Sequence, residues 1–137
     1  MNTISNDELI NKAKSIIKPH EVKHGFVASN CGCSLMTNEG NIYLGVAIDT
    51  CSSMGFCAEH GAIAAMITGG EYKIKKIVAV LEDGQILPPC GGCREFIYQI
   101  DGDNLETEVI IGENKVVKLR EFYSRIHGMK TSDTRKR

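Results

Sequence analysis

The chain has 137 residues, with 16 Lys and Arg against 17 Asp and Glu and a formal net charge of -1, which fits one domain. Apolar residues at 42% and charged residues at 24% are close to the averages for globular domains, and no apolar run is long enough to cross a membrane. Collagen-like, disordered and membrane-spanning chains are therefore excluded, and the balanced charge argues against a dedicated nucleic-acid binder.

Hydrophobic periodicity and turn-forming residues predict helices alternating with short strands. Ser5 and Glu8 form a capping-box pattern at the start of the first helix, and Pro19 ends its apolar periodicity. The run 77–81 is continuous and β-branched, which indicates a central strand covered on both faces. In chain order, the predicted elements after the first helix are a hairpin of strands 31–35 and 42–48, a loop over 49–56, a helix over 58–68, the strand over 77–81, a helix over 91–100, a strand over 107–111 with an extension at 116–117, and a helix over 119–126.

This order predicts an α/β fold, one sheet with helices on both faces, in a three-layer α/β/α sandwich. A single domain is expected over residues 1–127. Residues 128–137 carry four basic residues and no apolar anchor, so they are expected to form a disordered, solvated tail.

Six cysteines in a chain of this length are unusual. A disulfide framework is one explanation, but the N-terminal residues 1–8 are polar and acidic and lack a secretory signal pattern. The cysteines also occur in close pairs, at 31 and 33 and at 90 and 93. We therefore expect a reduced, cytoplasmic protein whose cysteines bind a metal or take part in chemistry.

Four residues at the starts of two predicted helices form a candidate metal centre. Cys57 precedes the helix over 58–68, and Cys90 and Cys93 lie three residues apart at the start of the helix over 91–100. Three thiolates with a fourth position open are typical of a catalytic zinc ion rather than of a closed structural site. Glu59 faces away from the ligand position and could transfer protons to a substrate. A nearby donor such as Arg94 could donate a hydrogen bond to a ligand sulfur.

The segments Cys57-Ala58-Glu59 and Pro89-Cys90-Gly91-Gly92-Cys93-Arg94 together resemble the zinc-dependent cytidine deaminase superfamily, in its small branch with three cysteine ligands. The resemblance covers about residues 5–127 and implies a mixed sheet. It implies one Zn²⁺ per chain on Cys57, Cys90 and Cys93, a substrate contact at Ala58, and a homotetramer. It also implies hydrolysis at C4 of a cytosine-like nucleoside to the uracil-like product and ammonia, with Glu59 as the proton shuttle.

The sugar-binding end of the expected site departs from this family. Nucleoside-specific members carry Gly-x-Asn-x-Glu, whose Asn and Glu hold the ribose, whereas this chain has Gly45, Ala47 and Asp49. Asp49 remains a candidate substrate-binding residue. The family's upstream phenylalanine is replaced at 29–30, and His60 occupies the place of a common arginine. A cytidine-like or deoxycytidine-like nucleoside is the expected substrate, with a modified cytosine nucleoside such as blasticidin S, or another exocyclic amine, left open.

Simpler interpretations of single residues also remain open. Cys90-x-x-Cys93 alone fits a redox dithiol, and Cys51 or His60 could complete a structural zinc site. Glu59 alone could complement the dipole of its helix. The remaining cysteines, at 31, 33 and 51, are expected to be small buried hydrophobic residues. A non-catalytic zinc-stabilised binding domain and an RNA-editing enzyme are the alternative functions, although we expect a small-molecule partner and neither nucleic acid nor membrane.

Overall fold

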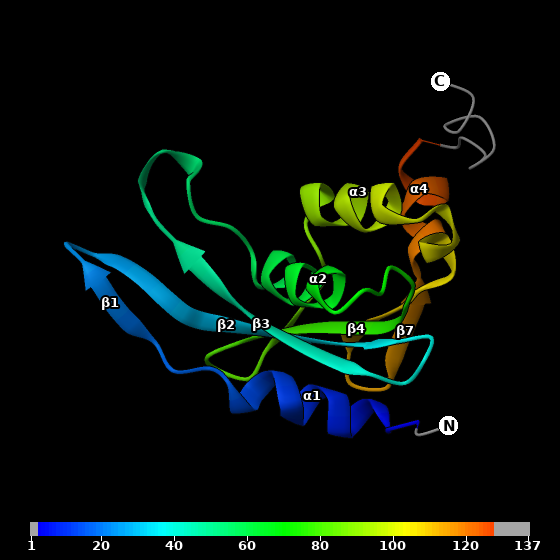
Figure 1. Ribbon diagram of the computed structural model, residues 1–137, viewed down its shortest axis with the longest axis horizontal. Coiled ribbons are helices and arrows are strands. Elements are labelled where there is room, and N and C mark those ends of the chain that lie inside the picture. Colours follow the sequence, from blue (N-terminus) through cyan, green and yellow to red (C-terminus); the bar gives the residue numbers. More distant parts are fainter. Residues whose placement is uncertain (1–2, 128–137) are drawn as a thin grey trace.

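The computed structural model describes residues 3–127, so the predicted tail at 128–137 lies outside the described residues. A seven-stranded mixed sheet forms the middle layer (Figure 1). Its order is β1-β2-β4-β6-β7, with β3 beside β2 and β5 beside β4. Among the strand pairs of the described residues, only β4 and β6 are parallel. The strands are β1 (His20–Lys23), β2 (Phe26–Thr37), β3 (Ile42–Asp49), β4 (Ile74–Leu81), β5 (Ile86–Leu87), β6 (Glu108–Gly112) and β7 (Lys115–Lys118).

Helices cover both faces of the sheet. Helix α1 lies on one face, and α2 and α3 lie on the other (Figure 1), which confirms the predicted α/β/α sandwich. The capping box of α1 is formed, because the Glu8 backbone N–H donates to Ser5 Oγ at 3.1 Å. The helices are α1 (Asn6–Ser15), α2 (Ala58–Thr68), α3 (Gly91–Ile100) and α4 (Leu119–His127), with 3-10 turns η1 (Cys51–Ser53) and η2 (Gly102–Glu106).

Strand β4 separates two apolar cores, as its β-branched run predicts. Ile77 faces the core under α2 and α3, and Val78 faces the core under α1. The larger core also contains Leu35 from β2 and Ile63 from α2, all nearly or fully buried. Because the strand is covered on both faces, the sheet provides a rigid floor beneath the start of α2.

Three strand features were not predicted from the sequence. Strand β1 is exposed along its whole length, so it carries no buried apolar residue that could mark it. Strand β5 has two residues, too few for a periodic pattern. Strand β2 begins at Phe26 rather than at residue 31, because an irregularity between Ala28 and Gly32, where Ser29 has a φ of 66°, interrupts the alternation.

Helix α2 crosses β3 at very short range because two glycines face each other. A Cβ on Gly45 would lie 2.6 Å from the carbonyl oxygen of Ala58, and a Cβ on Gly61 would lie 3.2 Å from the Cα of Gly45. Any larger side chain at Gly45 would therefore push the helix away from the strand. This approach fixes where α2 begins over the sheet.

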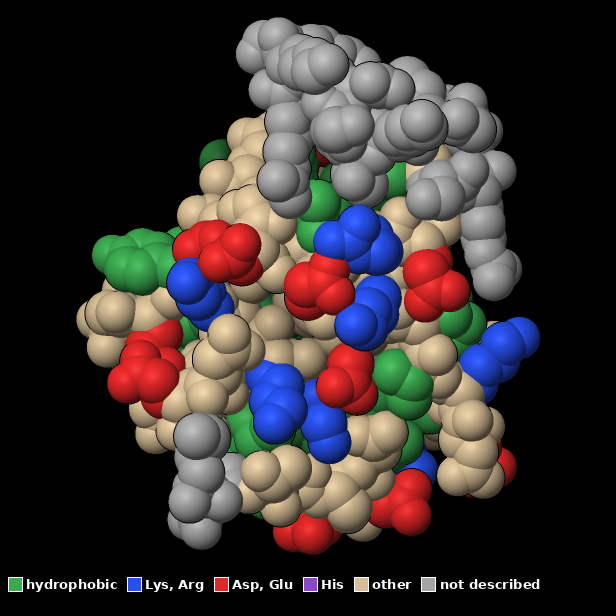
Figure 2. Space-filling view, turned by 90° about the vertical axis from the view of Figure 1, so that its right-hand side faces the viewer, with side chains coloured by type: hydrophobic (Ala, Val, Ile, Leu, Met, Phe, Trp, Pro, Cys, Tyr) green, Lys and Arg blue, Asp and Glu red, His purple; other side chains and the backbone are tan. Residues whose placement is uncertain are grey.

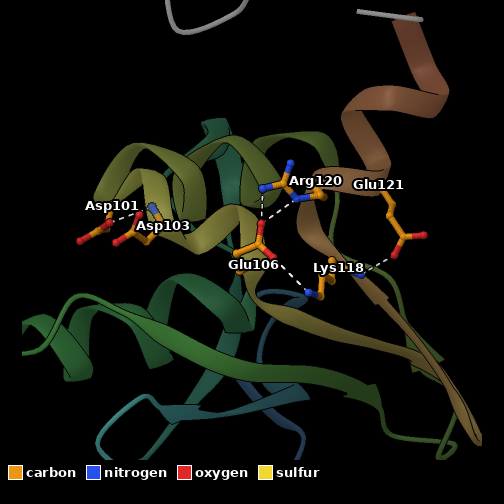
Figure 3. Close-up of polar contacts among 6 residues, drawn as sticks. All are labelled: Asp101, Asp103, Glu106, Lys118, Arg120 and Glu121. Atoms are coloured by element: carbon orange, nitrogen blue, oxygen red, sulfur yellow. Dashed lines mark hydrogen bonds and ion pairs between the residues drawn. The ribbon is translucent and has the colours of Figure 1, made fainter. Parts of the chain in front are cut away.

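The turn η2 joins the end of α3 to β4 through a buried amide. Asn104 Oδ1 accepts from the backbone N–H of Ile74 at 2.8 Å, and its Nδ2 donates to the carbonyls of Tyr72 and Ile97 at 3.0 and 3.1 Å. Nearby, Glu106 accepts hydrogen bonds from Lys118 and Arg120, which fastens η2 to β7 and α4 (Figure 3). On the face drawn in Figure 2, basic side chains lie beside acidic ones rather than forming a separate basic patch.

Candidate active site and metal centre

Three cysteine sulfurs converge where the starts of α2 and α3 meet. Cys57 is the N-cap of α2, Cys90 is the N-cap of α3, and Cys93 lies in the first turn of α3. The three Sγ atoms lie within 4.8 Å of one another, and those of Cys57 and Cys90 are 3.9 Å apart. The Cys93 backbone N–H donates to Cys90 Sγ at 3.4 Å, because the N-cap side chain folds back over its own helix.

This arrangement fits a zinc ion. A tetrahedral zinc with bonds of about 2.3 Å to sulfur holds neighbouring sulfurs about 3.8 Å apart, close to the separation of Cys57 and Cys90. Helix N-termini also favour thiolates, because their backbone N–H groups carry partial positive charge. Neither Cys51 nor His60 belongs to the cluster that the described residues form, so neither supplies the fourth ligand of a closed site there.

The three thiols differ in how readily they ionise. Burial and the nearby Glu59 carboxylate raise the pKa of Cys93, and burial raises the pKa of Cys57. Burial also acts to raise the pKa of Cys90, but hydrogen bonds led by the Cys93 N–H outweigh it and lower that pKa. A divalent cation that binds all three sulfurs must displace the protons that their thiol groups carry.

Glu59 is a buried carboxyl group beside the sulfur cluster. It lies in the first turn of α2 with 5% of its surface exposed, and it lines the same cavity as Cys57 and Cys90. Burial raises the pKa of its carboxyl group, whereas hydrogen bonds from its own N–H and from Cys93 act in the opposite direction. A carboxyl group whose pKa is raised by burial is suited to taking up and releasing protons.

The hydrogen bond that Arg94 could donate to a ligand sulfur is not formed. The Arg94 guanidinium lies over the ring of Phe122 in α4, 4.9 Å from its centroid, and its Nε is buried without a hydrogen-bond partner in the described part of the chain. Instead, His60 Nδ1 lies 3.6 Å from Cys93 Sγ. Arg94 does not reach a ligand sulfur, because its side chain leaves α3 on the side that packs against α4.

A cavity of about 510 Å³ opens beside the sulfur cluster. Asp49 and Ala47, from the end of β3, form part of its wall, and Ala58 contributes the start of α2. No Lys or Arg occurs among the described residues that line it. The structure thus brings all six predicted site residues together, namely Asp49, Cys57, Ala58, Glu59, Cys90 and Cys93.

A family comparison agrees with this geometry. The family described as "Cytidine and deoxycytidylate deaminase zinc-binding region" matches residues 5–109, which is more than half of the chain and includes every residue of the sulfur cluster. The chain belongs to the cytidine and deoxycytidylate deaminase family.

Curated relatives from this deaminase family match the chain over a shorter stretch. A cytidine deaminase from Sporosarcina psychrophila is 33% identical over 69 residues, which cover 50% of this chain and 51% of the relative. A cytidine deaminase from Mycobacterium tuberculosis is 25% identical over 75 residues, 54% of this chain and 56% of the relative. The chain therefore matches about half the length of these curated relatives.

Solved structures of cytidine deaminases share the fold over most of their length. The enzyme from Mycobacterium leprae superposes with a TM-score of 0.73 at 23% identity, covering 88% of this chain and 98% of that one. The enzyme from Bacillus anthracis has a TM-score of 0.69 at 20% identity, covering 95% and 91%. These similarities confirm the predicted cytidine deaminase-like α/β fold.

Some of the cavity wall in this deaminase-family chain was not anticipated from sequence. Thr50, Phe56 and Asn30 line the cavity, and Thr50 Oγ1 is buried without a hydrogen-bond partner in the described part of the chain. Thr50 follows Asp49 directly, so adjacency to a candidate residue was the available signal. No sequence signal marked Asn30, because it lies in the irregular part of β2.

The remaining cysteines only partly meet their expected role. Cys33 is fully buried in the larger core, and Cys31 is half-buried and lines the cavity. Burial, with Glu59 nearby, raises the pKa of Cys31 to about 11. The prediction for Cys51 is wrong: it is exposed, because it begins the 3-10 turn η1 in the loop beyond β3.

No helix in the described range is long and apolar enough to cross a membrane.

Proposed function

We propose that this protein is a zinc-dependent hydrolase that deaminates a cytosine nucleoside. The observation that carries the proposal is the cluster of Cys57, Cys90 and Cys93 sulfurs beside a cavity that also contains the buried Glu59 carboxyl group. Membership in a zinc-binding deaminase family and the names of the curated relatives support the same reaction. We propose one zinc ion per chain, held by the three cysteines. Since thiolate ligands require a reducing compartment, we place the protein in the cytoplasm.

Each residue of the site has a distinct task in this reaction. A bound zinc ion supplies a Lewis acid that makes a water molecule nucleophilic near neutral pH. The Glu59 carboxyl group would carry one proton from water to N3 of the ring and a second proton, released as the C4 hydroxyl group becomes a carbonyl, to the leaving amine. Ala58, at the start of α2, presents its backbone to the edge of the ring.

The charge of the cavity favours a nucleoside over a nucleotide. Its wall contains the carboxyl groups of Asp49 and Glu59, whereas none of the described lining residues is Lys or Arg. A phosphate group would therefore be repelled by the wall and find no basic partner there. Asp49 can accept hydrogen bonds from sugar hydroxyl groups, or pair with a cationic substituent.

The second candidate substrate is a modified cytosine nucleoside such as blasticidin S. The short side chain of Ala47 leaves space in the cavity wall, and Asp49 provides a negative charge that suits a cationic substituent. A non-catalytic zinc-stabilised binding domain is the remaining alternative, and Glu59 would then have no kinetic role.

An ammonia-release screen with one matched pair of variants tests the proposal. The substrates are cytidine, deoxycytidine, deoxycytidine monophosphate, free cytosine, blasticidin S and purine nucleosides, and N4-substituted cytidines are followed by the substituted amine that they would release. Glu59→Gln should retain zinc while kcat falls about 10²- to 10⁴-fold. Glu113→Gln, at an exposed turn, is the control and should match the unchanged protein. Full activity of Glu59→Gln, or zinc binding without turnover of any substrate, would refute the proposed reaction.

We also propose that the protein acts as a homotetramer on small molecules, without nucleic acid or membrane. Met54 and Phe56, which lie near the cavity, are 81% and 43% exposed, and a second copy of the chain would shield them from water. Sedimentation equilibrium should give four times the mass of one chain, and a single-chain mass would contradict this assembly.

A further inference from the structure

The side chain of His60 is held in place by two aromatic rings. Its imidazole stacks on the ring of Phe96 with a centroid distance of 4.4 Å and an angle of 11°. The centroid of the Phe56 ring lies 6.2 Å from that of the imidazole, with an angle of 26° between the two ring planes. These rings come from α3 and from the loop before α2, so the imidazole is fixed against two separate segments.

This fixed orientation directs one imidazole nitrogen to a candidate metal ligand. His60 Nδ1 lies 3.6 Å from Cys93 Sγ, within hydrogen-bonding range for sulfur. Cys93 is fully buried, so water does not reach its sulfur from outside. A buried thiolate gains stability from each N–H donor that reaches it, because it has lost its hydration.

The ligand set itself creates a need for such a donor. Three thiolates on one divalent ion leave a net charge of -1, which weakens the ion as an electrophile. Arg94 does not supply a donor, because its guanidinium packs on Phe122. The Cys93 backbone N–H is already directed to Cys90, and Glu59, which also contacts the Cys93 sulfur, carries no N–H group. His60 is therefore a described side chain that can offer an N–H donor to this sulfur.

We propose that His60 is a positioning residue whose Nδ1–H donates to Cys93 Sγ and thereby sets how tightly the three-cysteine site retains its metal. This inference rests on the zinc site of the proposed function, but not on which substrate is deaminated. Since Phe56 also lines the cavity, the same stack joins a wall of the substrate cavity to a metal ligand. Loss of the donor should therefore change the metal first and turnover as a consequence.

Two substitutions separate the hydrogen bond from the stacking. His60→Phe keeps an aromatic ring between Phe56 and Phe96 but removes the N–H donor. His60→Asn keeps an N–H donor but removes the ring. Phe96→Leu leaves His60 intact and removes the closer stacking partner, and His20→Phe on the exposed strand β1 is the control.

The main readouts are the rate of zinc transfer to a chromogenic chelator and the sulfur-to-cobalt charge-transfer band of the Co²⁺-substituted protein. For His60→Phe we expect zinc loss about 10- to 100-fold faster and a shifted band, with circular dichroism unchanged. His60→Asn should recover part of the retention, and Phe96→Leu should fall between His60→Phe and the unchanged protein. His20→Phe should have no effect.

The possible outcomes are distinguishable from failure of the proposed function. If His60→Phe matches the unchanged protein in zinc transfer and cobalt spectrum, the inference is overturned even if cytidine is deaminated. If His60→Phe does not fold, His60→Asn and Phe96→Leu decide, and unchanged zinc retention in both overturns the inference. Zinc binding without any deamination would refute the proposed reaction. The role of His60 would then still be decided by the zinc-transfer rate and the cobalt spectrum.

Discussion

At the scale of single residues, Gly45 determines how closely α2 approaches the sheet. A Cβ there would lie 2.5 Å from the carbonyl carbon of Gly61 and 2.6 Å from the carbonyl oxygen of Ala58, closer than real contacts allow. We expect Gly45→Ala to destabilise the protein by about 3 kcal/mol, since backbone rather than a flexible side chain must move. Chemical denaturation measures this cost.

The matched control for this substitution is Gly112→Ala, which also lies in a strand. A Cβ on Gly112 would meet only the Cβ of Lys115 at 3.7 Å, an ordinary contact. Its midpoint of unfolding should stay close to that of the unchanged protein. Equal stability of the two variants would show that the approach of α2 to β3 is not limited by the glycine.

At the scale of elements, Glu71 ties the β2–β3 hairpin to the connection between α2 and β4. Its Oε2 accepts from Asn41 Nδ2 at 2.8 Å and from the Tyr43 hydroxyl at 2.9 Å. Burial acts to raise the pKa of this carboxyl group, but hydrogen bonds from Thr37, Asn41 and Tyr43 outweigh it, so the pKa lies below its ordinary value. The ionised form is therefore the one that stabilises the fold.

The pH dependence of stability follows from this sign. A carboxyl group with a lowered pKa in the folded state contributes stability above its unfolded pKa of about 4.5, and the contribution is lost as pH falls through the folded pKa. Glu71→Gln should lower the free energy of unfolding by about 1 kcal/mol at pH 7. The difference in stability between the variant and the unchanged protein should shrink below about pH 4.5. Urea unfolding from pH 3 to 7 measures it, and a difference that stays constant over that range would contradict the assignment.

The elements that the sequence predicted well are those with a strong local pattern. The capping box at Ser5 and Glu8, the β-branched run of β4 and the apolar helix α2 all appear in the structure. The exposed strand β1 could not be predicted, since its pairing depends on a partner strand rather than on its own residues.

The candidate site divides in the same way. The convergence of Cys57, Cys90 and Cys93 followed from their spacing at helix starts, because a helix start fixes the direction of its first side chains. The side chain that contacts the Cys93 sulfur could not be predicted from the sequence. The choice between His60 and Arg94 depends on which segment packs against each helix.

At the scale of the whole molecule, the sulfur cluster connects two helices that are far apart in the sequence. Cys57 begins α2, and Cys90 and Cys93 begin α3, with β4 and β5 between them in sequence. A metal bound there stabilises only the folded state, because the unfolded chain does not hold the three sulfurs together. Folding and metal binding should therefore be linked.

Removing the metal should lower thermal stability by an amount set by metal concentration. At free zinc 100 times its dissociation constant, the linkage contributes about 2.7 kcal/mol, or roughly 10 °C in Tm for a domain of this size. Differential scanning calorimetry with and without a chelator measures the shift. Cys51→Ser, outside the cluster, should respond to zinc like the unchanged protein, whereas Cys90→Ser should respond little. If the chelator left the Tm of the zinc-loaded protein unchanged, the three sulfurs would not be a metal site, because binding restricted to the folded state must raise its stability.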